Sequence, residues 1–236
     1  MEKLRTRLIL DYLRKHKSCT LAELMQEFNV SSATIHRDVE ELAKRDAVER
    51  VRGGLVYNET TPVPQNAADF SERVVTNRKG KESAARKALA VIREGDIIFL
   101  DSSTTVYELA LLLRASPLEH LTIVTNSIAV MQNFRKYPQQ WVMIALGGNY
   151  DPQLNSILGA DALVQLGRFN LTRAFVSAFG IDDKNVTTNH ERQAEILRRV
   201  LESAQKRYLL ADKAKFGRTG LYRLSARGGF DAIFSG

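Results

Sequence analysis

The sequence predicts an α/β protein in which an N-terminal winged helix-turn-helix domain precedes a domain built on a parallel sheet. Three short helical patterns, separated by a polar cap and a tight turn, are followed by two short strands with a Gly-Gly pair between them. A polar stretch with two prolines comes next, and beyond it apolar strands alternate with helical patterns. The 236 residues suit one to two domains, because a domain commonly takes about 100–200 residues.

Composition and charge describe an ordinary globular chain, with 44% hydrophobic and 26% charged residues. The single cysteine, Cys19, excludes an internal disulfide framework and a multi-cysteine metal site. No apolar run reaches the roughly 18 residues that cross a bilayer, and the first residues lack the core of a secretory signal. We therefore expect a cytoplasmic protein with no membrane partner, metal or cofactor. The net charge is +7, but residues 1–60 hold 11 Lys+Arg against 10 Asp+Glu, so any DNA contact depends on where the charges point.

Residues 1–57 predict three helices and a hairpin. Residues 2–16 carry an apolar stripe at helical spacing. Thr20 and Glu23 fit a capping box at the start of the second helix. After a tight turn, Ser31 is the expected N-cap of the third helix, and helices joined in this way form a helix-turn-helix.

The hairpin that follows completes a winged helix. Residues 48–52 and 55–57 have strand character, and Gly53-Gly54 is expected to supply the positive φ of a two-residue turn. The tip of this wing carries Arg50 and Arg52, which are suited to DNA phosphates or to a minor groove.

The third helix has an apolar side, with Ile35, Val39 and Leu42, and a polar side. In a helix-turn-helix the front of this helix enters the major groove, where small residues permit close approach and polar ones donate to phosphates or base edges. A solvated helix in a three-helix bundle is the alternative for this helix alone, but the cap, turn and wing together favour DNA binding. Asp38 is expected to fix the helix through a salt bridge to Arg37 or a neighbouring helix end. The predicted DNA-binding residues are Ser31, Ser32, Thr34, His36, Arg37, Arg50, Arg52 and Gly53.

Residues 58–77 are polar, contain Pro62 and Pro64, and show no sustained period, so we expect a linker that ends where a second domain, residues 78–236, begins. Phe70 and Arg73 are expected to pin the end of this linker to the second domain. Buried strands are expected at residues 97–100, 121–125, 142–146, 174–178 and 207–210, and helices at residues 81–92, 106–113, 126–134 and 191–205. Their alternation predicts a parallel sheet with helices on both faces.

Polar, small and cationic residues follow several of these strands, at the edge where open α/β sheets bind ligands. Residues 102–105 open a helix, whose free amides and positive dipole end suit an anion such as phosphate. Lys213 would add a positive charge, and Gly147-Gly148 would let the backbone approach the ligand closely. Asp101 and Asn126 could hydrogen-bond sugar hydroxyls. A helix cap, a turn or a surface lysine explains each feature alone, whereas their convergence favours a pocket. The absence of G-x-x-x-x-G-K-[ST] argues against a nucleotide-hydrolysing site.

Two sets of motifs resemble the DeoR family of bacterial transcriptional regulators. The first is Leu21-Ala22-Glu23-Leu24, Val30-Ser31, Thr34-Ile35-His36-Arg37-Asp38-Val39, Arg50 and Gly53-Gly54. The second, "FLDSSTT", "VTNS", "LGG", "FGID" and "LADKAKFG", is similar to the family's C-terminal sensor domain. His36 stands where the family usually has Arg, and Arg52 where it usually has His, which leaves the operator sequence open.

The resemblance implies a sensor domain similar in fold to sugar-phosphate isomerases such as ribose-5-phosphate isomerase. It also implies a phosphorylated sugar surrounded by Asp101, Ser102, Ser103, Thr104, Thr105, Asn126, Gly147, Gly148 and Lys213.

Together these observations predict a DNA-binding transcriptional regulator, a repressor of a carbohydrate-utilisation operon. It would bind double-stranded operator DNA as a homodimer or homotetramer and would be released or modulated by a phosphorylated sugar effector. No catalytic residue is expected. One alternative is a sugar-phosphate isomerase-like enzyme with an appended DNA-binding module, in which Asp101 or Asp212 would be the base. Another is an activator or architectural DNA binder without a ligand.

Overall fold

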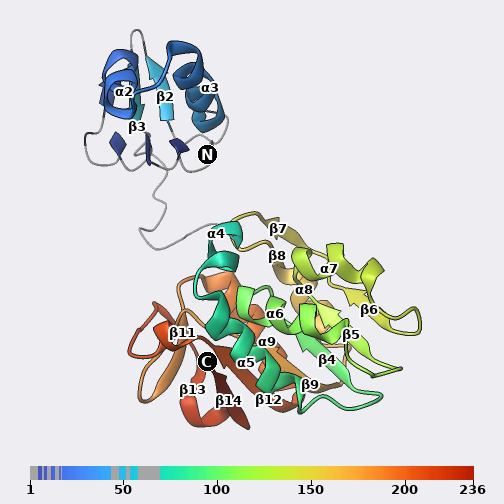
Figure 1. Cartoon of the computed structure of the whole chain (residues 1–236). Coiled ribbons are helices and arrows are strands. Elements are labelled where there is room, and N and C mark those ends of the chain that lie inside the picture. The colour runs from blue at the N-terminus through green and yellow to red at the C-terminus, as the bar shows by residue number, and fades with distance from the viewer. Residues whose placement is uncertain are drawn as a thin grey trace. The chain divides into compact units, whose positions relative to one another are not determined.

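The computed structural model describes residues 5, 6, 8, 9, 12, 13, 16, 18–43, 48–51, 54–57 and 70–236. The chain divides into two compact units, Met1–Ala67 and Ala68–Gly236, and each is described by itself (Figure 1).

The N-terminal unit contains the predicted helix-turn-helix. Residues 5, 6, 8, 9, 12, 13 and 16 are helical, α2 spans Leu21–Phe28 and α3 spans Ser32–Ala43. The capping box at the start of α2 is confirmed, since the Thr20 hydroxyl accepts from the Glu23 amide and the Glu23 carboxylate accepts from the Thr20 amide at 2.7 Å. A single core joins these helices to the wing, and it includes Ile9, Leu13, Leu24, Ile35, Val39, Leu42, Val48 and Leu55.

Three antiparallel strands complete this unit in the order β1-β3-β2, with β1 at Ser18–Thr20, β2 at Val48–Val51 and β3 at Gly54–Tyr57. The predicted hairpin is confirmed, but the position of its turn was wrong by one residue. Val51 pairs with Gly54, so the connecting residues are Arg52 and Gly53, and these two lie outside the described residues. Gly54 instead allows a close approach to β1, because a Cβ there would lie 2.5 Å from the carbonyl oxygen of Cys19.

The second unit is built on the predicted parallel sheet. Six strands pair in the order β14-β12-β9-β4-β5-β6, every pair parallel. Their bounds are Ala232–Ser235 for β14, Ala204–Ala211 for β12, Leu171–Val176 for β9, Ile97–Leu100 for β4, Thr122–Thr125 for β5 and Val142–Ala145 for β6.

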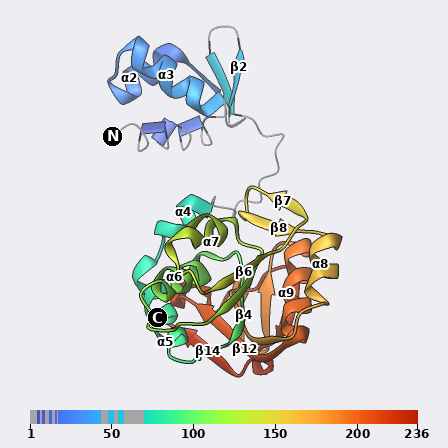
Figure 2. The same ribbon diagram turned by 90° about the vertical axis from the view of Figure 1, so that its right-hand side faces the viewer.

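Helices cover both faces of this sheet, as Figure 2 shows. On one face lie α5 (Arg78–Leu89), α6 (Thr104–Leu113) and α7 (Ile128–Asn133), and on the other α8 (Ala160–Leu166) and α9 (Glu191–Ser203). Within β4, Ile98 and Leu100 pack in the core under α5 and α6, whereas Phe99 packs in the core under α8 and α9. Successive side chains of β4 therefore point to opposite faces of the sheet, and both faces are buried. This explains why every residue of β4 is apolar.

Several elements of this unit were not anticipated. A helix, α4, occupies Phe70–Val75, within the range expected to be an irregular linker, and α5 begins at Arg78 rather than at residue 81. A hairpin of β7 (Asn149–Asp151) and β8 (Ser156–Leu158) precedes α8. A small antiparallel sheet joins β10 (Gly180–Ile181), β11 (Asn185–Thr188) and β13 (Tyr222–Ala226). Short 3-10 turns at Phe134–Lys136, Lys213–Lys215 and Arg227–Gly229 complete the unit.

Within the described residues, no helix has both the length and the apolar character to span a bilayer. The same part of the chain holds no cluster of three or more His, Cys, Asp or Glu placed to bind a metal ion.

Candidate functional site

The polar face predicted for α3 is exposed. Ser31, Ser32, His36 and Arg37 face solvent, and Thr34 is half-buried. The Ser31 hydroxyl accepts from the Thr34 amide at 3.4 Å and is 2.9 Å from the Thr34 hydroxyl, which confirms Ser31 as the N-cap. Hydroxyls therefore begin the helix, and an imidazole and a guanidinium follow one turn later on the same side.

The wing contributes a further cation beside this face. Arg50 on β2 is exposed, and its Nη2 lies 3.2 Å from Nδ1 of His36 on α3. The guanidinium donates to the imidazole in this contact, which joins the wing to the predicted recognition helix and keeps the two side chains side by side on one surface. Arg52 and Gly53, also predicted to bind DNA, lie outside the described residues.

Asp38 holds α3 against the first helix. Its side chain is buried, and it accepts from Arg5 twice, from Nε to Oδ2 at 2.5 Å and from Nη2 to Oδ1 at 3.0 Å. The expected salt bridge is therefore present, and its partner is Arg5 rather than the adjacent Arg37. A planar guanidinium that meets both carboxylate oxygens fixes orientation as well as distance, so this pair orients the exposed face of α3.

In the second unit, polar groups gather where β4, β5, β9 and β12 end, a region called here the strand-end edge. Asp101 follows β4 and is 1% exposed. Its Oδ1 accepts from the Ser103 amide and its Oδ2 from the Ser177 amide, both at 2.8 Å, so it ties the end of β4 to the end of β9. Burial raises the pKa of Asp101, although both amide hydrogen bonds favour its charged form.

The segment after Asp101 opens α6 as predicted. The Ser103 hydroxyl caps the helix by accepting from the Val106 amide at 3.2 Å. Ser102, Thr104 and Thr105 are buried at the same helix start. Ser103 thus has the helix-cap role, and the positive end of the α6 dipole faces the strand-end edge.

Asn126 lies at the end of β5 with 1% exposure. Its Nδ2 donates to the Ser156 hydroxyl at 2.9 Å and to the Ile157 carbonyl at 3.2 Å, which connects it to β8. Its Oδ1 is buried and has no hydrogen-bond partner among the described residues. An orphaned buried acceptor is costly, and a ligand hydroxyl would satisfy it.

Gly147 and Gly148, after β6, have contacts within the unit. The Gly147 amide donates to Gln165 of α8 at 3.0 Å. Gly148 has a φ of +146°, and a Cβ there would lie 2.6 Å from the Leu158 carbonyl of β8. These glycines therefore allow the chain to pass close to α8 and β8.

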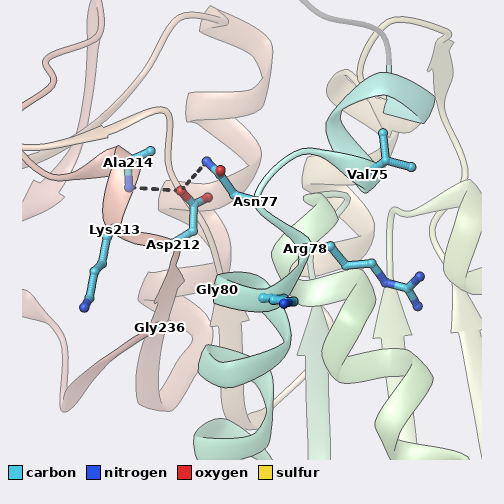
Figure 3. Close-up of a pocket in the computed structure, with 9 residues that line it drawn as sticks. Val75, Asn77, Arg78, Gly80, Asp212, Lys213, Ala214 and Gly236 are labelled. Atoms are coloured by element: carbon cyan, nitrogen blue, oxygen red, sulfur yellow. Dashed lines mark hydrogen bonds between the residues drawn. The ribbon is translucent and has the colours of Figure 1, made fainter.

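Lys213 is exposed and lines a surface hollow of about 590 Å³. The lining residues are Val75, Asn77, Arg78, Lys79, Gly80, Asp212, Lys213, Ala214 and Gly236 (Figure 3). In that view Asp212 points to Asn77 and the Ala214 amide, at 3.2 and 3.0 Å, while the Lys213 side chain extends away from them.

Cations that the sequence did not single out face the strand-end edge. Lys81 on α5 is 3% exposed, its Nζ donates to the Arg73 carbonyl, and burial lowers its pKa to about 8. Arg218 lies 4.4 Å and Lys215 5.8 Å from the ring centre of Phe179, which follows β9. Burial also lowers the pKa of Lys215. In the sequence Lys81 is one of several lysines of a charged helix, and no local signal distinguishes it.

A winged helix-turn-helix with an exposed recognition face, joined to an α/β unit with a polar strand-end edge, defines a DNA-binding transcriptional regulator. Comparison with known families agrees. Residues 5–61 match the DeoR-like helix-turn-helix domain and residues 76–236 match the DeoR C terminal sensor domain. The chain belongs to the DeoR family.

The relatives compared here are transcriptional regulators, and the similarity extends over most of both chains. The HTH-type transcriptional regulator IolR of Bacillus subtilis is 34% identical over 212 residues, which cover 89% of this chain and 82% of IolR. The HTH-type transcriptional repressor GlcR of the same organism is 28% identical, with 96% and 85% covered. The L-fucose operon activator of Haemophilus influenzae is 31% identical, with 98% and 90% covered.

Among solved structures, ribose 5-phosphate isomerase A of Methanocaldococcus jannaschii is similar with a TM-score of 0.39 and 16% identity, over 58% of this chain and 53% of the isomerase.

Proposed function

We propose that the protein represses a carbohydrate-utilisation operon and that a phosphorylated sugar bound at the strand-end edge controls its hold on operator DNA. The observation that carries this proposal is the gathering of several groups at that edge: the buried Lys81, the half-buried Lys215 and Arg218, the positive end of α6, the Asp101 carboxylate and the buried Asn126 oxygen that has no partner among the described residues. Cations and a helix start suit a phosphate, and carboxylate and amide oxygens suit sugar hydroxyls.

At the DNA end, Arg37, His36 and Arg50 are the proposed base or phosphate contacts, with Ser31, Ser32 and Thr34 at the phosphate backbone. Their exposure on one face and the burial of Asp38 behind it support this role. Arg52 and Gly53 are proposed to meet the DNA at the wing tip. A winged helix reads one half-site, so we propose that the protein acts in the cytoplasm as a dimer or tetramer on a two-fold related operator.

At the effector end, the proposed ligand-binding residues are Asp101, Ser102, Ser103, Thr104, Thr105, Asn126, Gly147, Gly148 and Lys213. The strongest support is the buried Oδ1 of Asn126, which lacks a partner among the described residues. Similarity to the transcriptional repressor GlcR supports repression, and similarity to the L-fucose operon activator supports control of a sugar operon.

The DNA end is tested with Arg37→Ala in a band-shift titration on the protein's own upstream region. Loss of a base contact should weaken binding by about 1–3 kcal/mol, or roughly 5- to 150-fold. Loss of a phosphate contact should instead reduce the slope of log affinity against log salt concentration by about one, because one fewer counterion is released. Arg86→Ala is the matched control, because Arg86 is an exposed arginine of the other unit. Equal affinity for the Arg37 variant and the control would remove Arg37 from the interface.

The effector end is tested with a thermal-shift panel of hexose, pentose and triose phosphates beside the unphosphorylated sugars. A specific phosphorylated sugar should stabilise the protein and change its operator affinity by about 5- to 150-fold. Lys213→Ala should keep DNA binding and need more effector. A protein that ignores the whole panel would refute the effector, and turnover of a sugar phosphate would favour the isomerase-like alternative.

A further inference from the structure

The strand β6 lies at one edge of the six-stranded sheet, and among the described strands it pairs with β5 alone (Figure 1). The amides of Val142 and Leu146 donate to carbonyls on the β5 side, at 3.0 and 2.9 Å. Backbone groups of successive residues point to opposite sides of a strand. Met143 and Ala145 therefore present their amides and carbonyls to the open side of β6.

Gln165 of α8 closes that open side just past the end of β6. Its Oε1 accepts from the Gly147 amide at 3.0 Å and its Nε2 donates to the Gly147 carbonyl at 3.4 Å, so one side-chain amide takes the place of a neighbouring strand. The backbone groups of Met143 and Ala145 have no hydrogen-bond partner among the described residues. A further strand can therefore pair along these two residues, and it must stop before Gly147.

The residues around this edge are uncharged. Residues 137–150 contain no Lys, Arg, Asp or Glu, although charged residues make up 26% of the chain. The Val142 side chain is 53% exposed, and Ala145 is exposed as well. Edge strands are commonly protected from pairing with another chain by charged side chains, lysine above all, or by proline. Since β6 contains neither, its edge is suited to pairing.

The opposite edge of the sheet shows the protection that β6 lacks. Nζ of Lys87 on α5 donates to the Ser235 carbonyl of β14 at 2.7 Å. Lys206 and Asp231 form an ion pair at 2.8 Å, and Asp231 directly precedes β14. Charged side chains thus accompany β14, so the contrast between the two edges assigns strand pairing to β6.

We propose that β6 pairs with β6 of a second copy of this chain, antiparallel about a two-fold axis at Ile144, and that two six-stranded sheets thereby become one. In this register Met143 of each copy lies opposite Ala145 of the other, and each such pair exchanges both backbone hydrogen bonds. A long side chain then meets a short one on one face of the joined sheet. On the other face, the exposed Val142 lies opposite Leu146 of the second copy.

The missing charges favour a second copy over an unrelated protein as the partner. A two-fold axis brings each residue of the edge close to its own equivalent, where any charge would meet a like charge. A strand pairing of this kind is therefore most stable when the segment carries none, as residues 137–150 do. The inference deepens the proposed function, on which it rests for the two-fold related operator, because it places the dimer interface on β6.

The test measures the mass of the full chain by sedimentation across the micromolar range. Met143→Pro removes a free amide and leaves the ladder with β5 in place, whereas Ala145→Lys adds a charge to the edge. Each should raise the dimer dissociation constant about tenfold or more. Leu221→Lys is the matched control, because Leu221 is 76% exposed just before β13 and gains the same charge. The control should dimerise within about twofold of the wild-type chain.

A charge exchange separates a lost interface from a misfolded chain. Ala145→Glu should by itself weaken the dimer as Ala145→Lys does. An equimolar mixture of the two variants should form the dimer again, because opposite charges then lie across the axis. Mixing would not restore a chain that had failed to fold, and the urea midpoint of the Trp141 fluorescence checks the fold of each variant.

A wild-type chain that stays monomeric, or β6 variants that dimerise as well as the control, would overturn the proposal. So would slow hydrogen exchange of the Met143 and Ala145 amides in a monomeric wild-type chain, since another part of the same chain would then cover the edge. Operator binding by a chain that dimerises through another face would overturn this interface and leave the proposed function standing. A dimer that depends on β6 but ignores its operator would do the reverse.

Discussion

Replacement of Asp38 by Asn tests whether the buried pair with Arg5 holds the recognition helix. Asn has nearly the same volume, so the change removes a charge without leaving a cavity. The Asn side chain is a neutral amide, in which an NH2 group replaces one of the two carboxylate oxygens that accept from Arg5. The guanidinium cannot donate to that NH2 group.

The expected loss is about 2 kcal/mol. Breaking a buried ion pair costs about 3–5 kcal/mol when the remaining charge stays buried. The Arg5 side chain is 25% exposed, so water solvates part of the charge left behind and the loss is smaller. A unit of this size has a stability of about 3–10 kcal/mol, at roughly 0.05–0.15 kcal/mol per residue, so this loss is a large fraction of it.

Two optical signals separate the two units in a urea titration. Trp141 is the only tryptophan, lies in the second unit and is 4% exposed, so its fluorescence reports unfolding of that unit. Far-ultraviolet circular dichroism reports both units. The dichroism transition that is absent from the tryptophan signal reports unfolding of the N-terminal unit. Asp38→Asn should lower the urea midpoint of that transition by about 2 M, since the dependence on urea is roughly 1 kcal/mol per molar, and should leave the tryptophan midpoint unchanged.

Glu40→Gln is the control, since Glu40 is an exposed carboxylate of the same helix, and it should change stability by about 0.5 kcal/mol or less. If Asp38→Asn shifts the midpoint no further than this control, the ion pair does not stabilise the unit. A variant that keeps full stability but loses operator binding would show instead that Asp38 acts on the DNA contact itself.

Three further predictions follow from single contacts. Gly54→Ala should destabilise the N-terminal unit by about 1–3 kcal/mol in the same dichroism titration, because its Cβ would meet the Cys19 carbonyl at 2.5 Å; an unchanged midpoint would contradict the close approach. Thr20→Ala should cost about 1 kcal/mol by the same measurement through loss of the capping box, and a neutral result would mean that water replaces it. The folded pKa of Lys81 is about 8 and the unfolded pKa about 10.4, so the unfolded chain binds more protons between these values, and the urea midpoint read by Trp141 should rise as pH increases from about 8 to 10. Lys81→Met should lose that rise.

The first unit shows how far local signals reach. The cap at Thr20, the cap at Ser31 and the apolar side of α3 depend on residues a few positions apart, and all were predicted correctly. The hairpin turn was misplaced by one residue because two adjacent glycines allow either register. Pairing with β1 decides between them, since Gly54 must lie against Cys19.

In the second unit the alternation of strands and helices was enough to predict the parallel sheet, but the short helix within residues 58–77 was not anticipated. The helix α4 has only six residues, which are too few to show a helical period in the sequence. Its position depends on the contact of Phe70 with Tyr107 and on the hydrogen bond from Arg73 to the Gln153 carbonyl. Phe70 and Arg73 were expected to pin this end of the linker, and these contacts confirm that they do.

By itself the sequence determined the helices and hairpin of the winged helix, the alternation of strands and helices that builds the parallel sheet, and the polar residues that follow those strands, because helix period, caps and turns depend on neighbours in the chain. Only the tertiary structure decided which charges are buried and which partners they meet. Arg5 and Asp38 are 33 residues apart, and Asn77 and Asp212 are 135 apart. Burial and pKa depend on everything that packs around a group, and the neighbours of Lys81 and Asp101 include Asp212 and Ser177, which come from distant segments of the chain.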